Sequence, residues 1–458
     1  MAVWTQPQLI ETYLNRRIDS EFFDPEYVKA ETETLECQTE KLGKLGVFFP
    51  GPFGSAFHVQ NYDFKSSYRY IRGRDVKPFF LLDDDNRYIP ESDFNRLTKY
   101  SVLLQDLMIS VVGTLGNVSI CTEDDTPAIF SCKSTIFRAE KIDPYYLLAY
   151  LNCHYGRMCL LRRQRGAVQT GLNIEDLHAV PVPRFKEGIE KQISSFVQSS
   201  RLAAKQAKAF YNQAQKLLES ELGLDKLKLD KLVGYTAQFS ELELSRRADP
   251  EYFDPVAASI VAKITEFDHI MLGSSFAVGN GFPWHSKKFL SDNSGEPVVR
   301  IRNIRPTHID VDELTSIDRD YARKVGFSKA NKGEIVIGMD GLKYFYASIL
   351  EGDCYINQRV AHLKPLSNAK ISSEYATFII NSRVGQTQLL RDMTIATTVG
   401  HITNRNIAKL VIPYVSDKFH DEITSLVRTS INKKQESKQL LDQAKSRVEQ
   451  LIEEAVQA

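Results

Sequence analysis

The chain has 458 residues but no run of 18 apolar residues, so its sequence offers no candidate for a membrane-spanning helix. Residues 1–10 include Pro7 and no cationic side chain, which is unlike a secretory signal peptide. The six cysteines form no CxxC pair and no Cys/His cluster with zinc spacing. We therefore expect a cytoplasmic protein with reduced thiols, no metal site and no membrane contact.

The sequence also lacks the short motifs of common enzymes. It contains no GxxxxGK[ST] phosphate loop, no GxSxG elbow, no HExxH pair and no GxGxxG turn after a strand. The run Asp143-Pro144-Tyr145-Tyr146 is comparable with the Asp-Pro-Pro-Tyr motif of adenine methyltransferases, but it lacks the second proline and a preceding glycine-rich cofactor loop. We interpret Asp143 as the N-cap of a helix with Pro144 in its first turn. These absences favour a protein that binds its target without catalysis and without a cofactor of its own.

An excess of charge of one sign is absent as well. Lysine and arginine total 58, and aspartate and glutamate also total 58, so the formal net charge is zero. This balance argues against a protein that coats nucleic acid by bulk charge, but it allows local basic patches. With 43% hydrophobic and 25% charged residues, the composition is that of a globular protein rather than a disordered one.

What the chain does contain is an internal repeat. Residues 14–25 read LNRRIDSEFFDP and residues 244–255 read LSRRADPEYFDP, with eight of twelve positions identical at an offset of 230. Residues 71–78 resemble residues 299–306 at nearly the same offset. A unit of about 230 residues is far longer than a solenoid repeat. We therefore expect two tandem domains, each with its own core.

Each copy begins with features of mixed α/β structure. Residues 106–120 and 334–350 each read as two apolar runs around a glycine-containing turn, which predicts a β-hairpin in each copy. Apolar residues spaced by three and four predict helical segments over 145–161 and 377–390.

Each copy ends in a segment that reads as a long helix. Residues 186–222 contain one glycine and no proline, and they carry a heptad pattern of apolar and small residues. The equivalent segment, residues 415–458, has a poorer pattern that drifts toward a period of 3.6. A lone amphipathic helix cannot bury its stripe, so we expect the two long helices to pair with each other, antiparallel and coiled-coil-like.

The expected fold class is therefore α+β, with approximate two-fold symmetry from the repeat at offset 230. The expected order is a first mixed α/β domain over 1–185, a central long helix over 186–222, a linker over 223–243, a second domain over 244–414 and a C-terminal long helix over 415–458.

Cationic side chains gather in matching parts of the two copies. Arg72, Arg74 and Lys77 correspond to Arg300, Arg302 and Arg305, and alternate residues of a strand point to one face of a sheet. Residues 144–174 contain four arginines and no acidic side chain. Guanidinium and amide groups beside glycines suit phosphate clamping and hydrogen bonds to base edges. Any one patch taken alone is better explained as a solvated surface, but the recurrence of such patches in both copies raises the case for nucleic-acid binding.

The repeated opening, Arg17-Ile18-Asp19-Ser20-Glu21-Phe22-Phe23-Asp24-Pro25 in the first copy, resembles the start of the target recognition domains in specificity (S) subunits of type I restriction-modification systems. Residues 113–117 (GTLGN), 356–360 (INQRV) and 166–183 (GAVQTGLNIEDLHAVPVP) are similar to further elements of that family. The family's order of domain, helix, domain, helix matches essentially the whole chain. In the second copy, residues 339–342 and 396–401 are loose versions of the family's GTxG turn and GxTQxxLN element.

The resemblance implies a subunit that is not an enzyme. Each target recognition domain of such a subunit reads one half of a split, asymmetric DNA sequence, and the paired helices fix the gap between the halves. The subunit docks two methyltransferase (M) subunits, which bring S-adenosylmethionine, and restriction (R) subunits join the complex. The expected partners are thus double-stranded DNA, two M subunits and R subunits.

From the basic patches and the resemblance together, we expect DNA contacts at twelve residues. They are Arg72, Arg74, Lys77, Arg162, Arg163, Arg165, Gln169, Arg300, Arg302, Lys343, Tyr344 and Arg359. Three other interpretations stay open at this point: the specificity subunit of a type IIB-like or variant system, a stand-alone nuclease, and a tandem scaffold that does not bind DNA.

Overall fold

The computed structural model describes residues 7–52, 54–166, 170–227, 234–290, 294–311, 314–396 and 398–458. The chain divides into two compact units. Unit 1 comprises Met1–Ala203 together with Gln435–Ala458, and unit 2 comprises Ala204–Lys434. Across the described ranges, no helix is both long enough and apolar enough to cross a membrane.

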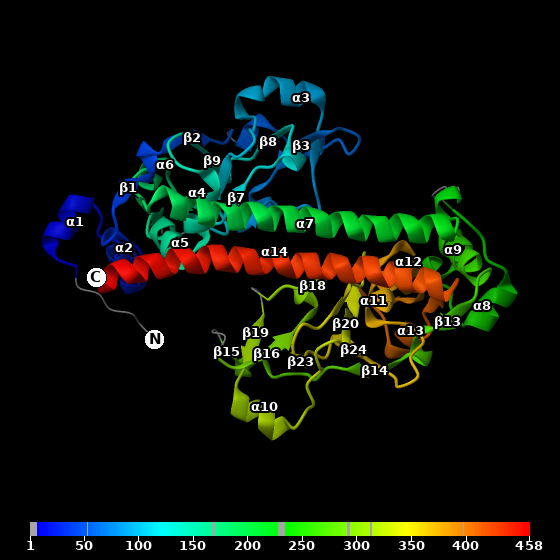
Figure 1. Ribbon diagram of the computed structural model, residues 1–458. Helices are drawn as coiled ribbons and strands as arrows, with labels where there is room; N and C mark the ends of the chain where they lie inside the picture. The colour runs from blue at the N-terminus through cyan, green and yellow to red at the C-terminus, as the bar shows by residue number, and fades with distance from the viewer. Residues whose placement is uncertain are drawn as a thin grey trace. The chain divides into compact units, whose positions relative to one another are not determined.

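Unit 1 is built on a five-stranded sheet in the order β2-β9-β6-β7-β4. Figure 1 labels β2, β9 and β7 of this sheet. The strands are β2 (Gly46–Pro50), β9 (Ser134–Ala139), β6 (Leu107–Ser110), β7 (Val118–Ile120) and β4 (Phe79–Phe80). The hairpin expected over 106–120 is confirmed, because β6 and β7 pair antiparallel with Leu107 opposite Ile120. A second sheet, in the order β5-β3-β8, contains β5 (Tyr88–Ile89), β3 (Tyr68–Ile71) and β8 (Ala128–Phe130).

The core of unit 1 centres on α4 (Pro144–Asn152), whose residues from Tyr146 to Leu151 are fully buried. The Asp143 carboxylate accepts hydrogen bonds from the amides of Tyr145 and Tyr146 at 2.8 and 3.0 Å, which confirms the expected N-cap. The helix expected over 145–161 is broken, because the backbone becomes extended at Cys153 before α5 (His154–Leu161) begins. Gly156 lets α5 approach α4 closely, since a Cβ there would lie 2.0 Å from the carbonyl oxygen of Tyr150.

Unit 2 has a four-stranded sheet in the order β14-β24-β20-β22. The strands are β14 (Phe276–Asn280), β24 (Val360–Pro365), β20 (Ile335–Gly338) and β22 (Ala347–Ile349). The hairpin expected over 334–350 is confirmed by the antiparallel pairing of β20 with β22. A second four-stranded sheet contains β15 (Phe289–Leu290), β19 (Thr315–Ile317), β16 (Glu296–Val299) and β23 (Tyr355–Ile356). The expected helix over 377–390 is again two helices, α11 (Ser373–Asn381) and α12 (Arg383–Asp392).

The two units repeat the same buried hydrogen bonds. The Tyr146 hydroxyl donates to the carbonyl of Pro183 at 2.7 Å, and the Tyr375 hydroxyl donates to the carbonyl of Pro413 at the same distance. In unit 1 the long helix follows the short strand β12 (Pro181–Pro183). In unit 2 the second long helix follows the short strand β27 (Val411–Pro413). The sequence repeat is therefore also a repeat of internal contacts.

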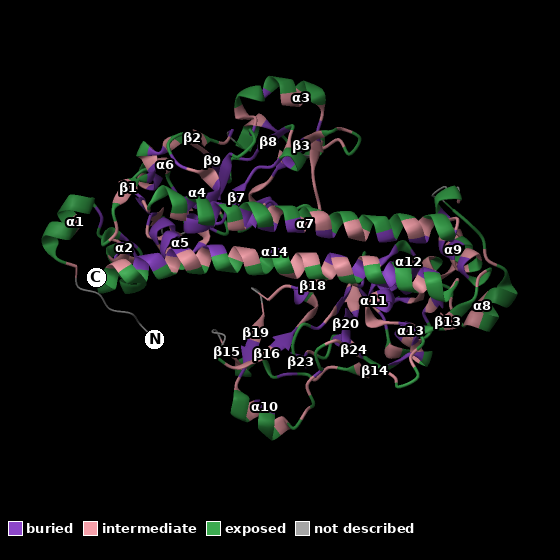
Figure 2. Ribbon diagram, in the orientation of Figure 1, coloured by how far each residue is buried: buried purple, intermediate pink, exposed green. Residues whose placement is uncertain are grey.

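Two long helices occupy the segments where the heptad pattern predicts them, α7 (Glu187–Glu221) and α14 (Asp417–Gln457). Both alternate between buried and exposed side chains along their length (Figure 2). Part of each helix joins the core of each unit. In unit 1 the core includes Ile193 and Val197 of α7 with Ala444 and Val448 of α14. In unit 2 it includes Ala214 and Leu218 of α7 with Ile423 and Val427 of α14.

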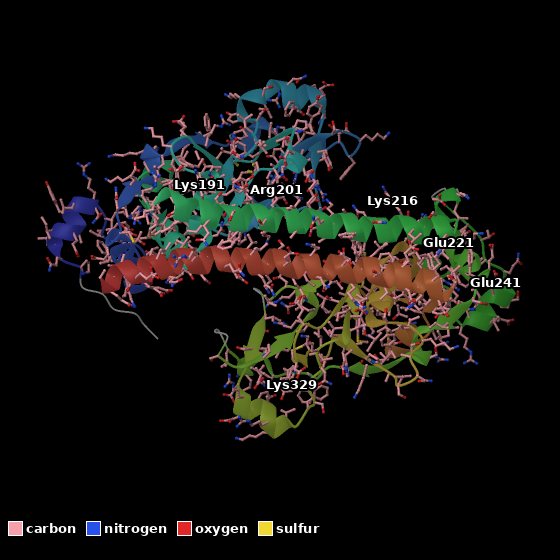
Figure 3. The ribbon with its side chains drawn as sticks, in the orientation of Figure 1. Lys191, Arg201, Lys216, Glu221, Glu241 and Lys329 are labelled. Carbon is pink, nitrogen blue, oxygen red and sulfur yellow. The ribbon has the colours of Figure 1, made fainter. Side chains whose placement is uncertain are left out.

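Polar contacts fix each half of these helices inside its unit. In unit 1 the hydroxyl groups of Ser200 and Ser437 lie 2.8 Å apart, buried between α7 and α14. Arg201 of α7 forms an ion pair with Glu123 and faces the Tyr145 hydroxyl (Figure 3). In unit 2 the Ser430 hydroxyl of α14 donates to the carbonyl of Ala207 at 2.7 Å.

Candidate nucleic-acid interface

The repeated opening motif places a buried arginine beside a small sheet in unit 1. The guanidinium of Arg17 donates to Asp19 from Nε at 2.7 Å and from Nη2 at 2.6 Å. Nη2 also donates to the carbonyl of Gln164 at 2.5 Å. Gln164 opens β10 (Gln164–Arg165), which pairs with β11 (Gly171–Leu172). The hydrogen bond from Arg17 lowers the pKa of Asp19, which stabilises the charged form of this carboxylate.

Unit 2 repeats this set of hydrogen bonds, in which one arginine joins the opening motif to a strand of the small sheet or the residue before it, and we call it the arginine clamp. Arg247 donates to Asp249 from Nε at 2.8 Å and to the carbonyls of Asp392 and Met393 at 2.9 and 2.6 Å. Met393 precedes β25 (Thr394–Ala396), which pairs with β26 (Val399–His401) and through it with β21 (Asp340–Gly341). The sequence repeat identifies the motif but not this role, because the carbonyl partners lie about 145 residues further along the chain.

Arg162 and Arg163 serve the packing of unit 1. The side chain of Arg163 is 7% exposed and donates to both carboxylate oxygens of Glu31 at 2.7 Å. Arg162 donates from Nε to the carbonyl of Phe22 at 3.0 Å and lies over its ring at 4.4 Å, and burial lowers the pKa of this guanidinium. Arg391 makes the matching contacts with Tyr252 in unit 2. We therefore leave Arg162 and Arg163 out of the surface that could meet DNA.

The expectation that Arg72 and Arg74 alternate along a β-strand is wrong. β3 ends at Ile71, and a 3₁₀ turn over Gly73–Asp75 follows. The carboxylate of Asp75 accepts a hydrogen bond from the backbone amide of Arg72 at 2.8 Å, and such local bonds favour a turn over a strand. The guanidinium of Arg72 then pairs with Asp75 at 2.8 Å, while Arg74 stays 62% exposed. Lys77, just after this turn, is also exposed.

The same correction applies to unit 2. β16 ends at Val299, and a 3₁₀ turn over Ile301–Asn303 follows. The side-chain oxygen of Asn303 accepts from the amide of Arg300 at 2.9 Å and closes the turn. The guanidinium of Arg300 lies 5.3 Å from the centre of the Phe289 ring, and Arg302 is exposed. Both units therefore present cations on an equivalent turn rather than on a strand face.

The small sheet of unit 1 carries one exposed arginine that a carboxylate orients. Arg165 on β10 is 46% exposed and donates to Asp176 from Nε at 2.5 Å and from Nη2 at 2.7 Å. These hydrogen bonds raise the pKa of Arg165. Nη1 of Arg165 makes no hydrogen bond within the described part of the chain. Gln169, the other residue expected here, lies outside the described residues.

Asp340 and His401, on the small sheet of unit 2, form a polar group with Arg359, which lies just before β24. Asp340 on β21 accepts a hydrogen bond from Nδ1 of His401 at 2.7 Å and forms an ion pair with Nε of Arg359 at 3.5 Å. Arg359 is 54% exposed and His401 is 32% exposed. Among these, sequence reasoning selects only Arg359. For Asp340 and His401, the sequence feature that could have identified them is their position in the loose GTxG and GxTQxxLN elements.

The loop after β21 adds an exposed cation and an aromatic ring. Lys343 is exposed, and Tyr344 is 56% exposed. The ring of Tyr344 stacks on that of Tyr346 with the centroids 5.2 Å apart and the planes within 10°. A cation next to an exposed, stacked ring is suited to contact with a phosphate and a sugar or base.

Residues 321–333 form a further basic segment, with four cations and no acidic side chain, but acidic neighbours partly neutralise it. Lys329 pairs with Glu296 at 2.6 Å (Figure 3). Arg323 is 78% exposed beside Asp320. Within the described ranges, no group of three or more His, Cys, Asp or Glu side chains is arranged to hold a metal ion.

No family model matches the chain, and no curated protein matches it. Among solved structures, it resembles the S subunit of the type I restriction-modification system from M. genitalium, with 13% identity over 91% of this chain and 95% of that one, at a TM-score of 0.42. The HsdS subunit from Thermoanaerobacter tengcongensis shares 11% identity over 90% and 95% of the two chains, at a TM-score of 0.28. The chain is similar to type I specificity subunits.

A partial similarity extends to the type IIG restriction endonuclease BpuSI. It covers 41% of this chain and 30% of that enzyme, with 10% identity and a TM-score of 0.28. Because all these TM-scores lie below 0.5, we base the function on the residues of this chain.

Proposed function

We propose that the chain is the non-catalytic specificity subunit of a type I restriction-modification system and reads a split, asymmetric DNA sequence. One observation carries the proposal. The two units share the clamps of Arg17 and Arg247 beside their small sheets, yet different side chains are exposed on those sheets. A common scaffold with different exposed groups is what two readers of two different half-sites require.

The proposed domains are the recognition domains 1–185 and 244–414, with the linker 223–243 and the long helices 186–222 and 415–458. An antiparallel pairing of the helices is supported by two contacts. Ser200 meets Ser437, and Ala207 meets Ser430. The second contact lies seven residues forward in α7 and seven residues back in α14. A rigid helix pair of this kind would set the distance between half-sites, which is a geometric property of such proteins.

The proposed DNA surface consists of cations, all exposed except the half-buried Arg300, and one exposed aromatic residue. Its members are Arg74, Lys77, Arg165, Arg300, Arg302, Lys343, Tyr344 and Arg359, with Gln169 included by its place in the sequence. Arginine pairs with guanine through two hydrogen bonds, and a lysine contacts phosphate as a point charge. The zero net charge fits a subunit that shares phosphate contacts with its partners.

The proposed partners are double-stranded DNA, two M subunits with their S-adenosylmethionine, and R subunits, in a cytoplasmic complex. Reconstitution tests this assignment. The chain is purified alone and with its methyltransferase partner, and methyl transfer to DNA and Mg²⁺-dependent cleavage are measured. We expect site-specific methylation only when both proteins are present. Cleavage of DNA by the chain alone would contradict the proposal and favour a nuclease.

A salt titration separates the proposal from a scaffold that does not bind DNA. Binding of the complex to a long duplex should weaken steeply between low and moderate salt, with a log–log slope of several units, because phosphate contacts release counterions. An affinity that does not change with salt would favour the scaffold.

A further inference from the structure

Asp340, Arg359 and His401 are brought together by three separate segments of unit 2. Asp340 and His401 lie directly opposite each other in the antiparallel pairing of β21 with β26. The carbonyl of Arg359 accepts a hydrogen bond from the amide of Met339, the neighbour of Asp340, at 2.9 Å. The backbone therefore fixes where all three side chains start, which is the condition for a preorganised site.

Within the described residues, Asp340 leaves Nε2 of His401 and the terminal nitrogens of Arg359 without a hydrogen-bond partner. A carboxylate only accepts hydrogen bonds, so the 2.7 Å contact puts a proton on Nδ1 of His401 and leaves Nε2 for another group. Asp340 pairs with Arg359 through Nε at 3.5 Å, so both terminal nitrogens of the guanidinium stay available in the part of the chain that the structure describes. Two parallel N–H groups of arginine match the O6 and N7 acceptors of guanine in the major groove.

Unit 1 has the same backbone contacts at this place but different side chains. The amide of Val111 donates to the carbonyl of Lys133 at 3.0 Å, as Met339 does to Arg359. The amide of Leu172 donates to the carbonyl of Val111 at 3.0 Å, as Ile402 does to Met339 at 2.9 Å.

These bonds align the two units residue by residue. The positions of Asp340, Arg359 and His401 are held in unit 1 by Val112, Lys133 and Gly171. All three side chains thus differ where the backbone is the same. A contact that only maintained the fold would have no reason to change at all three positions, whereas residues that read different bases must change.

We propose that Asp340, Arg359 and His401 form the base-reading site of unit 2, in which Arg359 pairs with a guanine of its half-site and Asp340 positions both Arg359 and His401. The inference rests on the proposed function and names the base chemistry of one half of the target. Asp340 is a positioning residue, since it acts on the bases through its two partners.

The test uses the full chain with its methyltransferase partner. The methylated sequence is first determined by sequencing genomic DNA, and the half read by unit 2 is the half that changes when residues 244–414 are exchanged. Arg359→Lys keeps the positive charge but cannot pair with guanine through two parallel hydrogen bonds. We expect this variant to lose preference at one guanine of that half by roughly five- to a hundredfold. Arg323→Lys, an exposed arginine of the same unit, is the matched control and should leave the sequence unchanged.

Asp340→Asn separates positioning from simple surface charge. Loss of an acid that only repels phosphate would strengthen binding to random DNA and leave sequence preference intact. Loss of a positioning residue reduces the preference at the same guanine, with the melting temperature and the other half-site unchanged. Replacing that guanine with 7-deazaguanine, which lacks the N7 acceptor, should weaken binding of the unaltered protein by a larger factor than binding of Arg359→Lys.

Three results would overturn the inference while the proposed function stands: a unit 2 half-site without guanine, an unchanged half-site in Arg359→Lys, or stronger random binding without lost preference in Asp340→Asn. Absence of sequence-specific methylation by the unaltered chain and its partner would instead overturn the proposed function.

Discussion

Arg247 donates a hydrogen bond from Nη2 to the main-chain carbonyl of Met393 at 2.6 Å. The repeated opening motif of unit 2 is thus bonded to the residue that directly precedes β25 of the small sheet. The equivalent bond in unit 1 joins Arg17 to Gln164. The motif that the two copies share is thus structural, and the sheet that it supports carries the side chains that differ between them.

Substitution of Arg247 by alanine should impair only one half of target recognition. The change removes charge-assisted hydrogen bonds, each worth about 1.5–3 kcal/mol, and frees the strand that pairs with the one carrying His401. We expect reading of the unit 2 half-site to weaken while reading of the unit 1 half-site is kept, as measured by sequencing methylated DNA. Arg17→Ala should show the reverse pattern. Equal loss in both halves from either variant would contradict the role of separate clamps.

The buried cluster of Glu31 with Arg162 and Arg163 should tolerate loss of one cation better than loss of the anion. Glu31→Gln leaves two buried guanidiniums without a counter-charge and should cost about 3–5 kcal/mol of unfolding free energy. Arg163→Met should cost less, because Arg162 still lies 3.3 Å from the carboxylate. Denaturant unfolding of the full chain measures both. The DNA sequence that the protein recognises should be the same in both variants. A changed recognition sequence in Arg163→Met would show that this arginine contacts DNA.

The hydroxyl groups of Ser200 and Ser437 should be coupled in their contribution to the free energy of unfolding. Ser437→Ala leaves the buried Ser200 hydroxyl without its partner and should cost about 1 kcal/mol or more, whereas the double alanine variant should be nearly neutral. A double-mutant cycle in denaturant measures the coupling. Strictly additive costs would show that the two hydroxyl groups do not interact.

Lys434 should give unit 2 a distinctive response to alkaline pH. Burial lowers the pKa of this lysine to about 8 from an ordinary value of 10.5. Between these values the unfolded chain binds more protons than the folded chain, so the stability of the folded state rises with pH. The full effect amounts to about 3 kcal/mol, because each tenfold difference in proton affinity corresponds to about 1.36 kcal/mol. Lys434→Met cannot titrate at this position. In thermal unfolding, its stability should therefore fall relative to that of the unaltered protein as the pH rises from 8 to 10.5.

The control for this experiment is Lys438→Met, because Lys438 is exposed on the same helix. It should follow the unaltered protein across the whole pH range. A constant difference in stability between Lys434→Met and the unaltered protein would contradict the lowered pKa of Lys434.

Sequence patterns predict much of the fold because the relevant signals are local. The heptad spacing predicts both long helices, the apolar runs around glycine predict both hairpins, and Asp143 with Pro144 predicts the start of α4. The breaks between α4 and α5 and between α11 and α12 escape prediction, because apolar spacing continues across Cys153 while the backbone turns.

The candidate site is less predictable, because charge alone does not reveal the partner of a cation. Arg163 and Arg165 are two residues apart in a basic segment, yet one is buried against Glu31 and the other is exposed beside Asp176. Asp340 and His401 are 61 residues apart, and only the pairing of β21 with β26 brings them together. Single-sequence reasoning therefore finds the basic segments but not which side chains reach the surface.

The sequence of methylated sites in cells that carry this chain with its methyltransferase tests the central claim most directly. Two recognition units joined by a fixed helix pair predict one motif with two different specific halves, separated by a gap of constant length. Exchange of residues 244–414 with those of a related chain should change one half and leave the other half and the gap as they were. A single continuous motif, or a change in both halves after the exchange, would contradict the account.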